Sequence, residues 1–576
     1  MKLFIVFSSN DLKNIKSTNI KRNIILGDVN SKLVKKPSLN SKQEEKIILL
    51  IKNLFKNYKK DFLRYLNGFI NKFYQSSVFP ITSYINSLDY YIKNNSQINE
   101  IVFPYKISSA NLGSTYNLAE HEVQTKLLYN RNEVIQPYLE LYCIYNNLKI
   151  SYTSKDKKSY YKYKIFIKKI LIFYTRFFVS QIKSLFYSID KKIVEKDFDI
   201  LAISRLPRKS EYLHSVFSNN ENKSLLICND TFLNFNSNFK FSNKYLKNFN
   251  LKVHNNSGAS FFNNIYLYIK VFFTQFFVKN IFIEFKNIKI NLTYAFKELI
   301  IDYADLVAYI KSNQELISKL NIKKGILLST ELKSPYAYAD YIIAKKNNLN
   351  CVHIMDCDLP SEKIPYPLFG DLLLTNTEDF SISYSHMNKD FKNKIKFWGN
   401  LSYFNMTKFD KKSNIWCFFT SSISSENKII FDKLLDYKVI SNINFIVKVH
   451  PRDNKNYYLN KGVRVISDDS ISKNDLFNKF NYAITFNSAI IHDLFIYDKP
   501  FFIIDYKYDN FFNIDVHSNS YKHILFNNNN FIDNITNNRR WIKSYRKYQI
   551  QYLKKNLKYD INSFMKNLVN YFKKQK

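Results

Sequence analysis

The sequence predicts an α/β protein in which parallel sheets are covered by helices and divided between two lobes. The chain has 576 residues, which exceeds the size at which one hydrophobic core keeps growing. Hydrophobic residues make up 46% of it, which is enough for large cores. Short apolar runs that end in small or polar residues alternate with longer stretches of helical period. That alternation is typical of parallel sheets covered by helices.

The first lobe is predicted to span residues 1–405. Its expected strands are 2–7, 100–103, 199–204, 224–228, 325–329, 350–355 and 371–375. Phe397 and Trp398, followed by Gly399 and Asn400, indicate a strand end and a turn, where one lobe passes into the next.

Two basic, aromatic-rich segments, 160–188 and 259–288, are predicted to be helical insertions in this lobe. Apolar residues of the second segment recur at helical spacing, as Phe262, Tyr266, Ile269 and Phe273 show. One interpretation is an ordinary helix that faces the core. The other is a helix that lies on a lipid surface, with its lysines against anionic headgroups. Lysines interrupt both apolar runs, so neither segment is predicted to cross a membrane.

The second lobe is predicted over residues 406–538, as a compact Rossmann-like unit with strands at 415–419, 445–449, 482–485 and 501–504. The tail, residues 539–576, combines many lysines with aromatic residues in a helical pattern. We expect this basic, aromatic helix to pack back across both lobes.

The charge distribution and the cysteines indicate which partners and which compartment suit the protein. The formal net charge is +38, but the lysines are spread along the whole chain and arginines are few, so no nucleic-acid partner is expected. An anionic substrate or an anionic membrane face suits the charge better. The five cysteines form no pattern typical of zinc sites or disulfides, which indicates a reducing compartment. The apolar run at the start is too short for a secretion signal, and we expect a cytoplasmic protein.

The most informative segment runs from Phe445 to Asp453. An apolar strand delivers His450, then Pro451 stops the strand and Arg452 follows. In parallel sheets ligands lie at the carboxyl ends of the strands, so His450 and Arg452 are candidates for binding a phosphate. A surface turn with an incidental histidine is the alternative.

A second segment has the same form. The strand at 482–485 is followed by Asn487 and Ser488, and a helix starts directly after them. The first turn of a helix is a ready anion site, to which the Ser488 hydroxyl can add a contact. Ser488 as a simple helix cap is the alternative.

Together the two segments resemble the donor lobe of a known family. Lys448-Val449-His450-Pro451 and Thr485-Phe486-Asn487-Ser488, closed by 497–502, are similar to the His-Pro and Ser motifs of bacterial GT-B capsule glycosyltransferases. These include sialyl- and polysialyltransferases, Kdo-type capsule transferases and teichoic-acid glycerophosphotransferases. The resemblance covers about the last third of the chain. Asn487 departs from it, because those families often have two hydroxyl residues there.

The resemblance implies two GT-B-like lobes and a donor linked to CMP or CDP, with no further cofactor. It implies that His450 and Ser488 contact the donor phosphate, with a neighbouring loop of hydroxyl residues completing the site: Thr420, Ser421 and Ser422. No metal is expected, although Asp356 and Asp358 have the spacing of a metal-binding pair.

An inverting transfer needs a base from the first lobe to take the acceptor proton. Glu120 and His121 are placed first, on a loose match to the acidic pair of the sialyltransferase-like families. Asp356, with Asp358 beside it, is the second choice and Glu331 the third. A solvated first helical turn is an equal interpretation for Glu120.

The expected function is therefore transfer of a sugar-like unit from a nucleotide-linked donor to a cell-surface polysaccharide or lipopolysaccharide. The partners are the donor, a glycan or glycolipid acceptor, and a peripheral contact with the inner face of the cytoplasmic membrane. Two alternatives remain open: a non-catalytic glycan- or nucleotide-binding protein, and a transferase that uses UDP- or GDP-linked sugars.

Overall fold

The protein is described by a computed structural model that covers most strands and helices of the chain. The described residues are 1–7, 11–12, 15, 23–27, 34–35, 37–57, 63–107, 131–157, 171, 175, 191–205, 213, 217, 223–230, 251–256, 261–278, 280–332, 334–354, 368–375, 378, 381–382, 385, 389–398, 415–421, 424–436, 444–450, 453–467, 471, 473–485, 490–504, 525–526, 546–547, 549–554 and 564–574.

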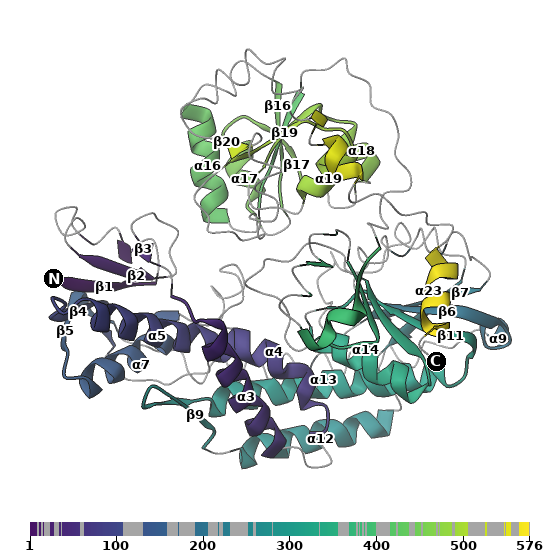
Figure 1. The fold of residues 1–576 in the computed structure, drawn as a ribbon, viewed down its shortest axis with the longest axis horizontal. Helices are drawn as coiled ribbons and strands as arrows, with labels where there is room; N and C mark the ends of the chain where they lie inside the picture. The colour runs from purple at the N-terminus through teal and green to yellow at the C-terminus, as the bar shows by residue number, and fades with distance from the viewer. Residues whose placement is uncertain are drawn as a thin grey trace.

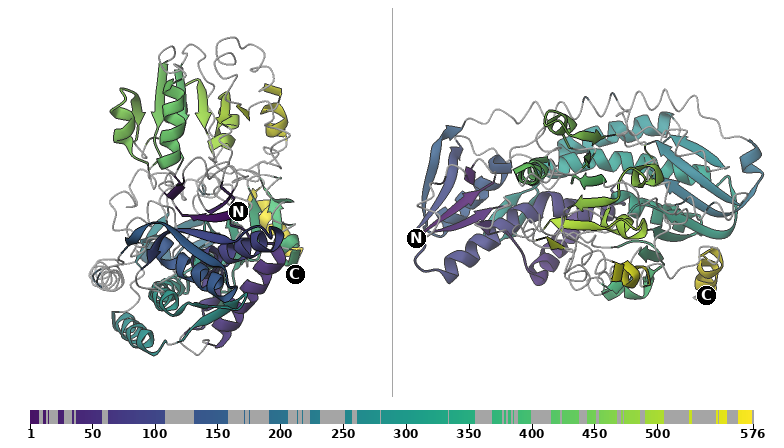
Figure 2. Two further views of the ribbon diagram at one scale, coloured as in Figure 1. Left: turned by 90° about the vertical axis from the view of Figure 1, so that its left-hand side faces the viewer. Right: turned by 90° about the horizontal axis from the view of Figure 1, so that it is seen from above.

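The predicted α/β class is confirmed. Three larger sheets contain only parallel strand pairs, and one small antiparallel hairpin accompanies them. Figure 1 and Figure 2 show the last sheet with its helices as one unit, above the unit that holds the first two sheets.

The first sheet has five strands in the order β3-β2-β1-β4-β5. Its strands are β1 (Lys2–Val6), β2 (Ile24–Gly27), β3 (Val34–Lys35), β4 (Glu100–Ile107) and β5 (Lys149–Lys157). The helices of this part are α3 (Ser41–Asn57), α4 (Ile70–Phe73), α5 (Phe79–Asn94) and α7 (Arg131–Tyr145), with a 3₁₀ turn η1 (Leu66–Phe69) and a π turn η2 (Tyr74–Val78).

The second sheet has seven strands in the order β14-β13-β12-β11-β6-β7-β8. Its strands are β6 (Asp197–Ser204), β7 (Ser224–Asp230), β8 (Lys252–Asn256), β11 (Asn321–Ser329), β12 (Asn350–Ile354), β13 (Leu372–Thr375) and β14 (Ile395–Phe397). Helices α9 (Lys191–Val194), α12 (Phe261–Phe277), α13 (Thr293–Ile317) and α14 (Pro335–Lys346), the turn η5 (Lys389–Lys394) and the hairpin β9 (Phe282–Phe285) to β10 (Ile288–Asn291) belong to this part.

The third sheet has six strands in the order β17-β16-β15-β18-β19-β20. Its strands are β15 (Ile415–Phe419), β16 (Asn444–Lys448), β17 (Arg464–Ile466), β18 (Tyr482–Thr485), β19 (Phe501–Ile504) and β20 (Leu525–Phe526). Its helices are α16 (Ser424–Asp436), α17 (Lys455–Leu459), α18 (Lys473–Phe477) and α19 (Ile490–Ile496).

The first two sheets share one hydrophobic core. Leu3 and Phe103 of the first sheet belong to the same buried cluster as Leu201 and Leu327 of the second, and α13 contributes many of the residues between them. The six-stranded sheet has a separate core on each face. Residues 1–405, predicted as one lobe, thus hold two parallel sheets joined by a common core. The boundary predicted near residue 405 lies outside the described residues.

The C-terminal tail contacts both units, as the sequence suggested. Tyr552 stacks on Phe495 of α19, with ring centroids 4.7 Å apart, and joins a core of the six-stranded sheet. The last helix, α23 (Phe564–Lys573), buries Leu568 and Phe572 against the seven-stranded sheet beside Trp398. The tail therefore ties the third sheet to the second.

Of the two predicted helical insertions, 259–288 contains α12, but the prediction of helix is wrong for its end, where Phe282–Phe285 form the strand β9 of the hairpin. Nearly all of 160–188 lies outside the described residues. No helix in the described part of the chain has the length and apolar character needed to cross a membrane.

Candidate functional site

The six-stranded sheet reverses its strand order beside β15. From β15 the chain proceeds to β16 and β17 on one side, and then returns to add β18, β19 and β20 on the other. Loops that leave β15 and β18 diverge at such a switch point, and the crevice between them is where open α/β sheets bind ligands. Phe419 is in register with both Lys448 and Thr485, so β16, β15 and β18 end at the same level.

Thr420 and His450 join the first two of these strand ends. The backbone N–H of His450 donates to Thr420 Oγ1 over 2.8 Å, and the Thr420 N–H donates to the carbonyl of Lys448 over 3.2 Å. Thr420 is buried, and the His450 side chain is half-buried at the edge of the sheet. Two residues predicted for the donor site are therefore hydrogen-bonded to each other, and the backbone of His450 is fixed one strand away from the switch point.

Ser421 is held by an amide that the sequence analysis missed. Asn427 Oδ1 accepts from the Ser421 N–H at 2.8 Å and from its hydroxyl at 3.1 Å, and Asn427 Nδ2 donates back to the Ser421 carbonyl at 2.8 Å. Asn427 also donates to Asp453 Oδ2 at 2.8 Å, and the Tyr458 hydroxyl donates to the same oxygen at 2.7 Å. This network fixes the loop after β15 against the loop after β16.

Thr485 ends β18 on the other side of the switch point. Its hydroxyl is buried and has no hydrogen-bond partner among the described residues. The chain leaves β18 here toward Asn487 and Ser488, which themselves lie outside the described residues.

The structure thus describes only part of the predicted site. It brings His450, Thr420 and Ser421 together at one sheet edge. The other predicted positions lie outside the described residues: Glu120, His121, Asp356, Ser422, Pro451, Arg452, Asn487 and Ser488. Their roles stay predictions.

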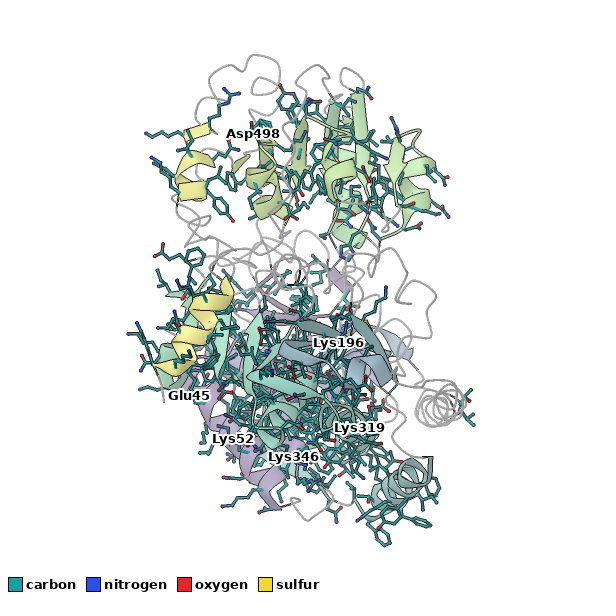
Figure 3. All side chains as sticks on the ribbon, turned by 90° about the vertical axis from the view of Figure 1, so that its right-hand side faces the viewer. Glu45, Lys52, Lys196, Lys319, Lys346 and Asp498 are labelled. Atoms are coloured by element: carbon teal, nitrogen blue, oxygen red, sulfur yellow. The ribbon has the colours of Figure 1, made fainter. Side chains whose placement is uncertain are left out.

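The closing segment of the motif has a structural role. Lys499 is almost fully buried, and its ammonium group donates to the carbonyl of Phe480 at 2.6 Å. Burial lowers the pKa of Lys499 to about 8. Lys499 therefore anchors the end of α19 to the turn that precedes β18. Figure 3 shows its neighbour Asp498 in the upper unit.

The seven-stranded sheet has a switch point of the same kind. Its first strand, β6, is followed by β7 and β8 on one side, and the chain later adds β11 on the other. Ser329 of β11 is in register with Ile203 of β6. Two residues beyond each, Arg205 and Glu331 leave the sheet at the same level.

Arg205 and Glu331 meet at that edge. Arg205 Nη1 lies 3.8 Å from Glu331 Oε1, and both side chains are largely buried. The guanidinium carbon of Arg205 lies 3.2 Å from the ring centroid of Tyr336, so the plane of positive charge is packed against an aromatic face. Glu331 Oε2 accepts from the Ser334 hydroxyl at 2.5 Å. The carboxylate is thereby held in one orientation.

Beneath this pair lies a buried polar layer. Asp340 accepts hydrogen bonds from the hydroxyls of Tyr309 and Ser329, and Ser329 Oγ in turn accepts from the Glu331 N–H at 3.1 Å. Burial raises the pKa of Asp340 to about 7, because the interior disfavours its charged form. The layer fixes the backbone of Glu331 from below.

His353 supports the same backbone from β12. Its Nδ1 lies 2.6 Å from the Glu331 carbonyl oxygen, which requires Nδ1 to carry a proton and donate. Burial lowers the pKa of His353 to about 4, so the ring is neutral. Gly370 makes room for it: the residue has φ +106°, and a Cβ there would lie 2.5 Å from His353 Cδ2.

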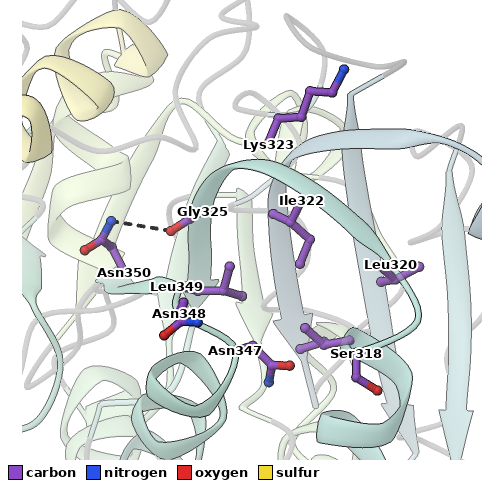
Figure 4. A pocket seen from close by; sticks show the side chains of 10 residues that line it. Ser318, Leu320, Ile322, Lys323, Gly325, Asn347, Asn348, Leu349 and Asn350 are labelled. Atoms are coloured by element: carbon purple, nitrogen blue, oxygen red, sulfur yellow. Dashed lines mark hydrogen bonds between the residues drawn. The ribbon is translucent and has the colours of Figure 1, made fainter.

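A pocket of about 410 Å³ lies at the opposite edge of this sheet. Figure 4 shows it among the end of α13, the start of β11 and the turn at 347–350, where Asn350 donates to the Gly325 carbonyl. These are the amino ends of the strands, away from Glu331. Because ligands of open parallel sheets lie at carboxyl ends, we do not assign this pocket a function.

The described residues contain no candidate metal site, and their cysteines are buried. Within the described ranges, no group of three His, Cys, Asp or Glu side chains could hold a metal ion. Four cysteines, Cys143, Cys228, Cys351 and Cys417, are buried free thiols. Asp356, Cys357 and Asp358 lie outside the described residues.

No protein-family model matches the chain, and no curated protein matches its sequence. Solved structures similar in fold include UDP-GlcNAc 2-epimerase of Neisseria meningitidis bound to UDP-GlcNAc, with 13% identity, a TM-score of 0.41, and coverage of 66% of this chain and 100% of that one. HepE of Anabaena in complex with UDP-glucose has 8% identity, a TM-score of 0.41 and the same coverage. The wall teichoic acid polymerase TagF has 10% identity, a TM-score of 0.34, and coverage of 71% and 97%.

Proposed function

We propose that this chain is a GT-B-type transferase that moves a sugar or sugar-like unit from a nucleotide-linked donor to a cell-surface glycan on the cytoplasmic side of the membrane. The observation that carries the proposal is the switch point beside β15. There His450 and Thr420 sit at adjoining strand ends, next to the place where the chain leaves β18 toward Ser488. The motif resemblance favours a donor linked to CMP or CDP.

In the proposed reaction the acceptor hydroxyl oxygen attacks the anomeric carbon. The bond from that carbon to the donor phosphate oxygen breaks, and its electron pair stays on the phosphate. His450, Arg452 and Ser488 meet the charge that develops there. Donors that are already in position lower the barrier most, because they need no reorganisation during the reaction. The bonds that hold the His450 backbone and the Ser421 loop supply such a fixed frame.

The acceptor proton needs a base on the other side of the crevice. Glu120, His121 and Asp356 remain proposals from the sequence. Glu331 is the candidate that the structure describes, and it leaves the seven-stranded sheet at that sheet's own switch point. Its orientation is fixed by Arg205 and Ser334, as a positioned base requires.

The test is to incubate the full chain with CMP-, CDP-, UDP- and GDP-linked sugars and a glycan acceptor, and to measure nucleotide release. We expect release with a CMP- or CDP-linked donor that depends on the acceptor. Release only from UDP- or GDP-linked sugars would keep the transferase and overturn the donor class. Saturable donor binding without release from any of them would overturn the transferase.

That last outcome would favour a non-catalytic glycan- or nucleotide-binding protein. One observation supports this second candidate: Glu331 is only 6% exposed and is paired with Arg205, which leaves little of its carboxylate open to an acceptor. A binder would keep the donor crevice and use the second switch point for stability alone.

A further inference from the structure

Helix α12 has two apolar faces, of which one is covered. Leu267 and Val278, the residue that follows the helix, are buried in the large core shared by the first two sheets, and Gln275 beside them donates to the Lys297 carbonyl of α13. The other face is exposed to solvent. Its members are Tyr266 (65% exposed), Ile269 (51%), Phe273 (56%) and Phe277 (79%).

The spacing of these four residues places them on one stripe. With roughly 100° of rotation per residue, they fall within an arc of roughly 80°, and the buried positions lie on the opposite side of the helix. Figure 1 and Figure 2 show α12 at the outer edge of the lower unit, beyond α13, and Figure 3 shows side chains of this helix projecting outward. A single exposed apolar residue is ordinary, but a continuous aromatic stripe marks an interaction surface.

Charge indicates what covers the stripe. The sequence has no Asp or Glu between Asp230 and Glu284, while it has lysines throughout that stretch: Lys240, Lys244, Lys247, Lys252, Lys270 and Lys279. Lys270 borders the stripe, and its ammonium group lies 5.7 Å from the ring centroid of Tyr266. Aromatic residues beside lysines, with no acid in the same stretch of sequence, match the boundary between acyl chains and anionic headgroups. A second copy of this face would instead bring like charges together.

We propose that α12 docks the protein on an anionic lipid surface, with Tyr266, Ile269, Phe273 and Phe277 inserted at the headgroup level. The helix lies in the plane of the surface, since its opposite face is fixed in the core. This inference does not depend on the proposed reaction. If both hold, the docked helix keeps the transferase at the membrane where a glycolipid acceptor lies.

The test is flotation of the full chain with vesicles of phosphatidylcholine alone or with about a third of phosphatidylglycerol. We expect binding to the anionic vesicles that weakens as salt is added. The double variant Phe273→Ser, Phe277→Ser should bind them at least tenfold more weakly. The matched control is Ile144→Ser, Tyr145→Ser, which removes two exposed apolar side chains from α7 and should bind as the unaltered chain does.

Circular dichroism and the melting temperature of each variant verify that it is folded. Equal binding by the α12 variant and the unaltered chain would overturn the proposal, as would binding to neutral vesicles with the same strength. So would a dimer that is lost in the α12 variant, because a second copy would then cover the stripe. As a direct probe, the indole of Phe277→Trp should be quenched by brominated lipid, and an unchanged emission would contradict insertion.

Discussion

Two strand switch points of this chain share a topology and differ in chemistry. In the six-stranded sheet, the positions two residues beyond the paired strand ends are Ser421 and His450. In the seven-stranded sheet the positions two residues beyond the ends of β6 and β11 are Arg205 and Glu331. β11 lies across that sheet's switch point from β6, whereas β16, which precedes His450, lies on the side of β15 away from β18. The first edge carries hydroxyls, an amide and an imidazole, all of which can donate hydrogen bonds. The second edge carries an ion pair that largely neutralises itself.

This difference suggests that the two sheet edges bind different substrates. Hydrogen-bond donors held in a fixed frame suit a ligand that brings its own negative charge, such as the phosphates of a nucleotide. A carboxylate that is oriented by a cation suits a neutral hydroxyl whose proton must be taken. Under the proposed function, the edge of the six-stranded sheet receives the donor and the edge of the seven-stranded sheet receives the acceptor hydroxyl.

The largest effect is expected from His450→Ala. Removing the imidazole should lower kcat by about 10²–10⁴-fold, since it removes a contact to the charge that develops on the phosphate. Steady-state nucleotide release measures it. The melting temperature should stay nearly unchanged because this side chain is only half-buried. Full turnover in the variant would contradict the donor crevice.

The second largest effect is expected from Glu331→Gln, which tests the role of the other switch point. Transfer should fall by about 10²-fold, as for loss of a general base. The Kd for the donor nucleotide, measured by calorimetry, should stay the same, because the change lies at the other switch point. Partial rescue by Glu331→Asp separates a catalytic carboxylate from a structural one. A change in donor affinity as large as the change in turnover would break the proposed division.

The buried layer beneath Glu331 should make stability depend on pH in two opposite directions. His353 has a folded-state pKa of about 4, below its ordinary value, so its contribution is lost as pH falls from about 6.5 toward 4. Asp340 has a folded-state pKa of about 7, above its ordinary value, so its contribution is lost as pH rises from about 4 toward 7. Each amounts to up to about 3–4 kcal/mol.

Substituting His353 and Asp340 one at a time separates their contributions to the pH dependence of the unfolding free energy. Relative to the unaltered chain, His353→Gln should flatten the loss of unfolding free energy at acidic pH, and Asp340→Asn should flatten the loss near neutral pH. Urea unfolding at several pH values measures both. The groups that face Asp340 are Tyr309, Ser329, Glu331 and Arg205. Tyr309→Phe removes a hydrogen bond that favours the charged carboxylate, so it should raise the pKa of Asp340 further and keep a slope near neutral pH. Parallel curves for all variants would contradict the assigned pKa directions.

The smallest effect is expected from Asn427→Ala. It removes the amide oxygen that accepts from the Ser421 N–H and the amide N–H that donates to Asp453 Oδ2, which costs about 1–3 kcal/mol of unfolding free energy. Donor affinity should fall as well, since the Ser421 loop loses its anchor. A variant that is destabilised but binds the donor with unchanged Kd would show that this network supports only the fold.

The strands that the sequence predicted well are those that are buried on both faces. Every predicted segment, from 2–7 to 501–504, contains or overlaps a strand of a parallel sheet. The missed strands are short or polar: β3 has two residues, and β5, with the sequence KISYTSKDK, carries little apolar signal. Without β2, β3 and β5, the N-terminal sheet could not be recognised as separate from the seven-stranded one.

The placement of residues at strand ends was predictable from local pattern. The structure has His450 just after β16 and the hydroxyls just after β15, as the sequence indicated, and their role in binding stays a prediction. Asn427 was missed because it lies inside α16, where no neighbouring residue signals its role. Arg205 was missed because its partner Glu331 is brought to it only by the pairing of β6 with β11. Contacts of that kind depend on topology, which the spacing of residues does not encode.

The most direct measurement is a crystal structure of the full chain with a donor nucleotide bound. We expect the nucleotide phosphates at the carboxyl edge of the six-stranded sheet, between the ends of β15 and β18 and within hydrogen-bond reach of His450. A nucleotide bound elsewhere, such as beside Arg205 at the seven-stranded sheet, would contradict this expectation.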